Sequence, residues 1–319
     1  MKTRPLGSTG FQVSEISLGG LFLGKLGGGR DTLGTLSKAA DLGINFVDTA
    51  PAYQGSEEAL GVALKQGGLR KKFWIATKWW AYGEGGKELI TDPAALRRNV
   101  EGSLTRLQTD HIELFQFHSV THPGDVAKLC RDEIQSELAK LKSEGKILHV
   151  GLSNEGKDDP SDARLIEALE SGRFETVMPE LLLFRQGPAK KLLPLAKAKH
   201  KGVISITPLG QSAWGLGLRD KKALLASMEL YISQGKLPDA APYHDASVLD
   251  FLLDEHTPDL ASAALRFCLS HAELSTVCCG SNDPLHLEAN AAQSAAPPYD
   301  STRMRRAAEL FGSLDALPR

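Results

Sequence analysis

The chain has 319 residues, 42% of them hydrophobic, which is enough for a sizeable core in one large α/β domain or two smaller ones. Its 37 basic and 39 acidic residues leave a formal charge of -2, which gives no electrostatic reason to expect nucleic acid or an anionic membrane as a partner. No uncharged apolar run approaches the ~20 residues that span a bilayer, and the first residues lack the apolar core of a secretory signal. We therefore expect a cytoplasmic protein.

The four cysteines, Cys130, Cys268, Cys278 and Cys279, have no spacing typical of a zinc site. The adjacent pair lies in the apolar run "LSTVCCG", where buried reduced thiols are the ordinary expectation. In a reducing compartment we expect no structural disulfide, and we predict no bound metal.

The first predicted element is a β-hairpin from Thr3 to Val13, where "GSTG" joins two short extended pieces. The stretch "GGLFLGKLGGGR" that follows the first strand is predicted to be a loop. Its glycines lack the spacing of a dinucleotide-binding turn, and no helix opens immediately after them. This argues against a doubly wound sheet, the main competing fold.

Short apolar runs alternate with helical patterns along the rest of the chain. The predicted strands are "VSEISLGG", "INFVDT", "FWIATK", "IELFQFH", "ILHVGLS", "FETVMPE", "GVISITP" and "LSTVCCG". The predicted helices include one that opens at Ser56, Glu57 and Glu58, together with Thr32 to Asp41, Pro93 to Leu107, Val126 to Leu141, Asp162 to Leu169, Ala189 to Ala198 and Leu260 to Leu269.

Eight strands alternating with helices favour an α/β fold of the (β/α)8 TIM barrel type, for which ~250 residues is typical. We expect residues 1–319 to form a single barrel domain, with the hairpin capping its bottom. The segment from Trp214 to His256 has no clear strand, and it predicts a long loop with some helix after the seventh strand.

Four polar side chains stand at or just after the ends of three successive predicted strands. Asp48 ends the second strand and Tyr53 follows on its loop, while Lys78 ends the third and His118 ends the fourth. Each one alone has an ordinary structural interpretation, such as a helix cap or a surface lysine. Because a parallel barrel brings its strand ends together at one rim, we expect the four side chains to converge.

Such a group suits proton transfer to a carbonyl oxygen. Tyr53 keeps its proton at neutral pH and can donate it, and a nearby Lys78 is expected to make the phenol a stronger acid. Asp48 would pair with Lys78, and His118 would orient the substrate oxygen. No protein side chain supplies hydride, so reduction would require a nicotinamide cofactor.

Several motifs together resemble the aldo-keto reductase superfamily across nearly the whole chain. They are "GINFVDTAPAYQGSEEALG", "ATK", "LFQFH", "GKILHVGLSN" and "TPLGQS". The likeness leans toward bacterial and plant members that act on sugars and small carbonyls, including aldose and galactose dehydrogenases. It implies a (β/α)8 barrel with Asp48, Tyr53, Lys78 and His118 as a catalytic tetrad, and a small carbonyl or alcohol compound as substrate.

The same resemblance implies that NADP(H) or NAD(H) binds along the carboxyl rim. The residues that match cofactor positions are Ser153, Asn154, Met178, Ile206, Pro208, Leu209, Gln211, Gly280, Ser281, His286 and Asn290. Met178 and Ile206 replace a glutamine and an aromatic ring that many relatives carry. Gly280 and His286 stand where NADPH-selective relatives place lysine and arginine. NADP(H) is favoured as the commoner choice of the superfamily, and NAD(H) stays open.

Bulky residues near the rim are expected to line a substrate pocket, namely Leu21, Phe22, Trp79, Trp80 and Tyr82. Two alternatives to a carbonyl reductase remain at this point. One is an NAD-linked dehydrogenase that oxidises an aldose to its lactone, and the other is a cofactor-binding regulatory subunit without useful turnover. The sequence does not indicate the oligomeric state.

Overall fold

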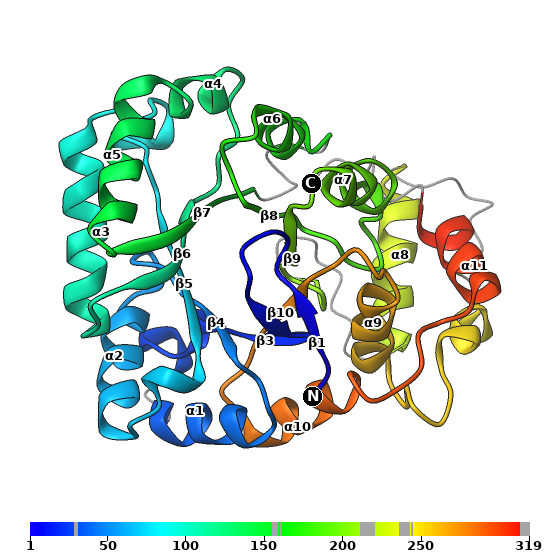
Figure 1. The fold of residues 1–319 in the computed structure, drawn as a ribbon. Helices are drawn as coiled ribbons and strands as arrows, with labels where there is room; N and C mark the ends of the chain where they lie inside the picture. Colours follow the sequence, from blue (N-terminus) through cyan, green and yellow to red (C-terminus); the bar gives the residue numbers. More distant parts are fainter. Residues whose placement is uncertain are drawn as a thin grey trace.

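A computed structural model describes residues 1–28, 31–154, 159, 161–210, 221–235, 243 and 245–312. Within these residues, eight parallel strands close into a barrel in the order β10, β3, β4, β5, β6, β7, β8, β9 (Figure 1). This confirms the predicted barrel. The barrel strands are β3 (Ile16–Gly19), β4 (Phe46–Asp48), β5 (Trp74–Trp79), β6 (Ile112–Phe117), β7 (Ile147–Ser153), β8 (Thr176–Met178), β9 (Gly202–Ser205) and β10 (Thr276–Gly280).

An antiparallel hairpin, β1 (Thr3–Pro5) and β2 (Gln12–Ser14), closes the amino end of the barrel, as predicted (Figure 1). Leu6 and Val13 are fully buried there, in the same cluster as the inward-facing Phe46. The turn comes so close to β9 that a Cβ on Gly7 would stand 2.2 Å from the Gly202 nitrogen. The hairpin thus leaves only the carboxyl rim open for a site.

Helices surround the barrel and bury their apolar faces against it (Figure 1). They are α1 (Thr32–Asp41), α2 (Ser56–Gln66), α3 (Pro93–Leu107), α4 (Asp125–Leu129), α5 (Asp132–Ser143), α6 (Ala163–Ser171), α7 (Gly187–Ala198), α8 (Lys221–Ser233), α9 (Leu260–Leu269), α10 (Pro284–Ala292) and α11 (Ser301–Phe311).

Two helical predictions differ from the structure. The helix predicted from Val126 to Leu141 is divided into α4 and α5, because Arg131 adopts an extended conformation with φ -64° and ψ 151°. Helix α11 was not predicted. Its sequence is strongly charged, and it is held by three buried residues at its end, Ala307, Leu310 and Phe311.

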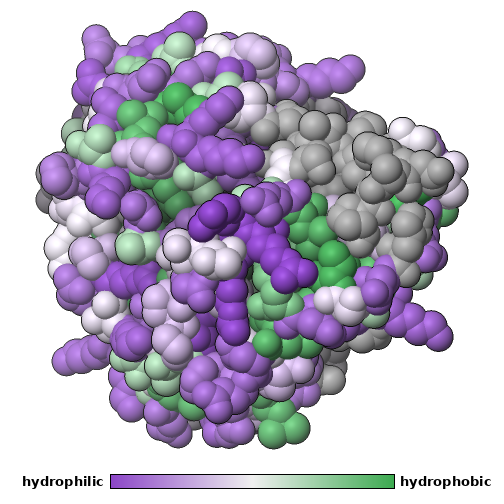
Figure 2. All heavy atoms as spheres, turned by 90° about the vertical axis from the view of Figure 1, so that its right-hand side faces the viewer, coloured by the Kyte–Doolittle hydropathy of each residue, from purple (hydrophilic) through white to green (hydrophobic). Residues whose placement is uncertain are grey.

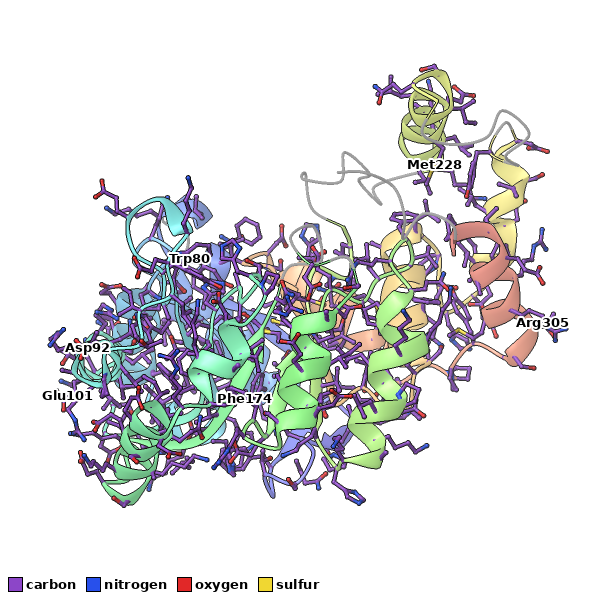
Figure 3. The ribbon with its side chains drawn as sticks, turned by 90° about the horizontal axis from the view of Figure 1, so that it is seen from above. Trp80, Asp92, Glu101, Phe174, Met228 and Arg305 are labelled. Atoms are coloured by element: carbon purple, nitrogen blue, oxygen red, sulfur yellow. The ribbon has the colours of Figure 1, made fainter. Side chains whose placement is uncertain are left out.

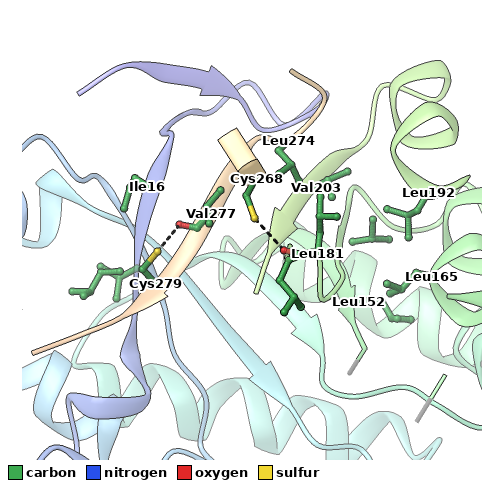
Figure 4. Packing of buried hydrophobic residues seen from close by; sticks show 14 of the residues in the cluster. Ile16, Leu152, Leu165, Leu181, Leu192, Val203, Cys268, Leu274, Val277 and Cys279 are labelled. Atoms are coloured by element: carbon green, nitrogen blue, oxygen red, sulfur yellow. Dashed lines mark hydrogen bonds between the residues drawn. The ribbon is translucent and has the colours of Figure 1, made fainter. Parts of the chain in front are cut away.

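The core between the strands and the helices contains two buried cysteines, one from a helix and one from a barrel strand. Figure 4 shows Cys268 of α9 and Cys279 of β10, whose thiols donate to the carbonyl oxygens of Leu181 and Val277 at 3.3 and 3.8 Å. All four cysteines are free thiols.

The segment after β9 lies at the rim and contains described helix in two places, α8 and the 3-10 helix η6 (Ala246–Leu252). In Figure 3, Met228 of α8 and Trp80 after β5 both lie at the end of the barrel opposite the hairpin. Hydrophilic side chains predominate on the face seen in Figure 2, with a smaller apolar area near its centre. Among the described residues, no helix has the length and apolar character to cross a membrane.

Candidate active site

The centre of the rim is a buried ion pair between Asp48 and Lys78. Parallel pairing sets Asp48 of β4 opposite Ala76 of β5, two residues before Lys78, so both side chains face the barrel interior. Both residues are 2% exposed. The Lys78 ammonium donates to Asp48 Oδ2, and its second hydrogen bond goes to the carbonyl oxygen of Thr49 at 3.0 Å.

The third donor of Lys78 is directed at the phenol of Tyr53. The distance from Lys78 Nζ to the Tyr53 hydroxyl oxygen is 3.2 Å, and the ammonium lies 4.8 Å from the ring centroid. An ammonium has three hydrogens and no acceptor, so these three bonds use its whole donor capacity. The Tyr53 oxygen therefore accepts from Lys78, and its own proton is free for a group bound at the rim.

His118 stands beside this pair, just beyond the end of β6. Its backbone nitrogen donates to the Trp79 carbonyl at 2.9 Å, which fixes the chain at the rim. Its ring meets the Tyr53 ring edge-on at 5.9 Å between centroids. Burial, assisted by the charge of Lys78, lowers the pKa of His118 to about 3, so the imidazole is neutral at physiological pH.

The protonation states of the other members follow from burial and charge. Burial opposes the charged form of Lys78, but the adjacent Asp48 carboxylate raises the pKa of Lys78 overall and keeps it an ammonium. Burial also raises the pKa of Tyr53, and Lys78 offsets only part of that rise. Burial is the larger effect, so the net pKa of Tyr53 is raised, although Lys78 acts in the expected direction and lowers it.

The two residues expected to hold a nicotinamide amide lie at the end of β7. Ser153 Oγ accepts from the Ser119 nitrogen at 3.1 Å. Asn154 Nδ2 donates to Asp159 Oδ2 at 3.1 Å, while Asn154 Oδ1 is buried without a hydrogen-bond partner among the described residues. An amide N–H donor suits such an oxygen, so Asn154 fits the carboxamide of a nicotinamide.

Across the rim, the residues expected to hold the adenosine half lie at the end of β10, on the short loop after it and in α10. Ser281 Oγ accepts from the Asp283 nitrogen at 3.1 Å, and the Asp283 side chain caps α10 by accepting from the Leu285 nitrogen. His286 is exposed, whereas Asn290 is 8% exposed. A helix amino terminus with exposed polar side chains suits a phosphate, so this end also fits the cofactor.

Met178, Ile206, Pro208 and Leu209 lie between these two ends. Met178 is fully buried in the barrel interior with Ile204, and Ile206 packs partly buried against the same cluster. Pro208 is buried and Leu209 is half-buried. Gln211 lies outside the described residues.

The five predicted pocket residues do not form one group. Trp80 is 47% exposed and meets His118 edge-on at 6.0 Å, whereas Phe22 is 40% exposed on a different loop, over Gly280 of β10. Leu21, its neighbour, is half-buried. Trp79 and Tyr82 lie elsewhere, in the core.

The structure corrects the prediction that Trp79 lines the pocket. Side chains alternate along a strand, so Trp79 faces away from the interior side on which Lys78 lies. It is 7% exposed and packs against Phe117, with 6.1 Å between ring centroids. Tyr82 is 6% exposed, and its hydroxyl is engaged by Asp125 and Thr121 rather than open to a pocket.

Comparison with known proteins identifies the family and the fold. The family model described as "Aldo/keto reductase family" matches residues 16–310, which is most of the chain. The chain belongs to the aldo/keto reductase family. It is accordingly an NAD(P)-dependent oxidoreductase, and the family acts on small carbonyl substrates.

Three similar proteins are distant relatives of this aldo/keto reductase that align with nearly its whole chain. An uncharacterized oxidoreductase of Bacillus subtilis is 28% identical over 91% of this chain and 90% of that protein. The L-galactose dehydrogenase of Arabidopsis thaliana is 28% identical over 92% of this chain and 88% of that protein. The holo form of an aldo-keto reductase from Bacillus halodurans superimposes with a TM-score of 0.70 at 27% identity, covering 97% and 96% of the two chains.

One residue of this aldo/keto reductase was missed by the sequence reasoning. Gln116 of β6 is fully buried, and its Nε2 donates to Asp48 Oδ1 at 3.1 Å, so the carboxylate oxygen that does not meet Lys78 is also held. A signal was present, because Gln116 precedes His118 by two positions and therefore shares its face of the strand. A polar residue on the inward face of an apolar strand requires a partner.

Proposed function

We propose that this aldo/keto reductase reduces an aldehyde or ketone to an alcohol, and catalyses the reverse oxidation, with Tyr53 as general acid and base. The observation that supports this most strongly is the hydrogen bonding of Lys78. Its three donors are used by Asp48, Thr49 and Tyr53, so the Tyr53 proton is the one directed away from the pair. We also propose that residues 1–319 act as one barrel domain in the cytoplasm.

Each member of the tetrad has a distinct task in this proposal. As the carbonyl oxygen gains negative charge, Tyr53 donates its proton, and the adjacent ammonium of Lys78 stabilises the resulting phenolate. Asp48 keeps Lys78 charged. The neutral His118 orients the substrate oxygen by hydrogen bonding. Asn154 at one end and the α10 terminus at the other would hold the nicotinamide cofactor, which would supply the hydride.

The proposal is tested by turnover with NADPH and with NADH against a panel of aldehydes, ketones and aldoses. We expect carbonyl-dependent oxidation of at least one reduced cofactor. Cofactor binding, followed by tryptophan fluorescence, without turnover of any member of the panel would contradict it and favour a regulatory subunit.

A second candidate, oxidation of an aldose to its lactone with NAD, is favoured by the likeness to the Arabidopsis L-galactose dehydrogenase. The same side chains would serve, with Tyr53 acting as the base. Initial rates with NAD and NADP on aldoses distinguish this direction from carbonyl reduction.

We further propose that the cofactor is NADP(H), held through the adenosine end of the rim. We expect His286→Arg to raise the ratio of kcat/KM for NADPH over NADH by about tenfold, since arginine adds a permanently charged fork for the 2'-phosphate. His286 is exposed, so the longer side chain costs no repacking. His286→Gln is the matched control. An unchanged ratio in the arginine variant would show that position 286 does not reach that phosphate.

The state of His118 predicts the pH dependence of reduction. Burial and Lys78 lower the pKa of His118 to about 3, so the imidazole stays neutral as pH falls from 8 to 5. We expect kcat/KM for reduction to show no inflection from a histidine across this window. A loss of activity centred near pH 6.5 that disappears in His118→Asn would contradict the assignment.

A further inference from the structure

We propose that Tyr82 and Asp125 are positioning residues that hold Trp80 as one wall of the substrate pocket, and that this wall selects substrates with a flat ring next to the reacting carbon. The inference rests on the proposed carbonyl reduction, since it concerns the same site. It differs from the sequence expectation, in which Tyr82 itself lines the pocket.

Trp80, like Tyr53, is an aromatic residue that lies beside His118 at the rim. It is 47% exposed, although it follows the buried end of β5, and Figure 3 shows it at the carboxyl end of the barrel. Its ring meets His118 edge-on at 6.0 Å and the Tyr82 ring at 5.4 Å. A group bound to His118 therefore lies next to an indole that is partly open to solvent.

Tyr82 joins the loop that carries Trp80 to the loop that follows β6. Its hydroxyl donates to Asp125 Oδ2 at 2.7 Å and accepts from the Thr121 nitrogen at 3.2 Å. Asp125 is 1% exposed, and its other oxygen accepts from Lys128 at 2.9 Å. A hydrogen bond to a buried carboxylate is among the stronger kinds, so we expect it to hold the Tyr82 side chain in this position.

A second hydrogen bond connects the same two loops. His122 Nε2 is 3.1 Å from the carbonyl oxygen of Gly86, and since a carbonyl only accepts, that nitrogen carries the proton. The His122 ring also packs edge-on against Tyr82 at 5.5 Å. The backbone of Gly86 passes close to the indole, because a Cβ there would stand 3.7 Å from Trp80 Cζ2. The loop after β5 and the loop after β6 thus pack together as one wall of the site, and Trp80 is part of this wall.

The chemistry of the wall indicates the substrate class. An indole face attracts flat apolar surfaces, including aryl rings and the C–H face of a pyranose, and it offers little to a short acyclic chain. Because Trp80 is held before any ligand binds, a ring loses less freedom when it docks there. We expect this advantage in KM, since the wall lies beside the reacting atoms and donates nothing to them.

The test compares benzaldehyde with propanal in Tyr82→Phe, Trp80→Ala and the double variant, with Tyr299→Phe as control. Tyr299 is a buried tyrosine whose hydroxyl also donates a hydrogen bond, in its case to the carbonyl oxygen of Leu252, away from these loops. We expect Tyr82→Phe to raise KM for benzaldehyde about fivefold and Trp80→Ala about tenfold. We expect a smaller rise in KM for propanal than for benzaldehyde in both variants, and the control to match the unaltered protein.

The double variant decides whether Tyr82 acts through Trp80. If it does, Tyr82→Phe adds no further rise in KM when Trp80 is already alanine. Additive effects, or an equal rise in KM for propanal and benzaldehyde, would overturn the inference while leaving carbonyl reduction established by propanal turnover. Failure of the unaltered protein to reduce either aldehyde, or any other carbonyl, would overturn both proposals.

Discussion

Replacing Tyr53 with phenylalanine is expected to lower kcat for carbonyl reduction by at least ~100-fold, the low end of general acid catalysis. The substitution removes only the hydroxyl that accepts from Lys78 at 3.2 Å and whose own proton faces the rim. The ring and its edge-on contact with His118 remain, so the pocket keeps its shape. Steady-state rates with the best carbonyl substrate measure the effect.

Cofactor affinity serves as the internal control for this variant. The residues proposed to hold the cofactor lie on other elements, Asn154 after β7, Ser281 after β10 and Asn290 in α10. The Kd for NADPH from tryptophan fluorescence should therefore stay within about twofold. A large change in Kd would indicate that Tyr53 shapes the cofactor site. Turnover close to that of the unaltered protein would contradict the assignment of Tyr53 as the general acid.

Lys78→Met is expected to abolish measurable reduction and to lower the free energy of unfolding by about 3–5 kcal/mol. The activity is lost because the phenolate of Tyr53 loses the cation that stabilises it. The stability is lost because Asp48, 2% exposed, keeps a buried charge with no cation beside it. Burial already raises the pKa of Asp48, and without the opposing charge of Lys78 this pKa rises further, so the stability deficit should shrink as pH is lowered. Urea unfolding at several pH values measures this.

The double variant Lys78→Met with Asp48→Asn separates the two losses. Asparagine removes the stranded charge and retains an acceptor for Gln116 Nε2, so most of the stability should return. Activity should not return, because no cation faces Tyr53. Recovery of turnover in the double variant would show that the charge of Lys78 is not needed for proton transfer. A double variant as unstable as Lys78→Met would show that the stability is lost through altered packing and not through the uncompensated charge of Asp48.

The alternation of apolar strands and amphipathic helices was enough to predict the barrel, the amino-terminal hairpin and the strand ends at which Asp48, Lys78 and His118 stand. These features depend on local periodicity and on a general property of parallel barrels. The division of α4 from α5 depends on the backbone of a single residue, Arg131, within a continuous helical pattern. Local periodicity does not report such a break.

Side-chain direction at the rim was predicted less well. Trp79 was expected in the pocket because it is large and close to Lys78, but adjacent residues on a strand face opposite sides. The same rule, applied to "LFQFH", would have put Gln116 on the face of His118 and predicted a partner for Asp48. For Tyr82, no local rule identifies Asp125 as its partner, since the two residues lie 43 positions apart in the sequence.

By itself, the sequence determined the fold class, the rim as the place of the site, and the residue types that suit proton transfer, because strand ends and side-chain chemistry are local properties. Tertiary structure alone decided the protonation states and the walls of the site. Burial raises the pKa of Tyr53 in spite of the neighbouring ammonium, and it lowers that of His118. Burial and contacts between distant loops are properties of the packed chain, so no single segment of sequence contains them.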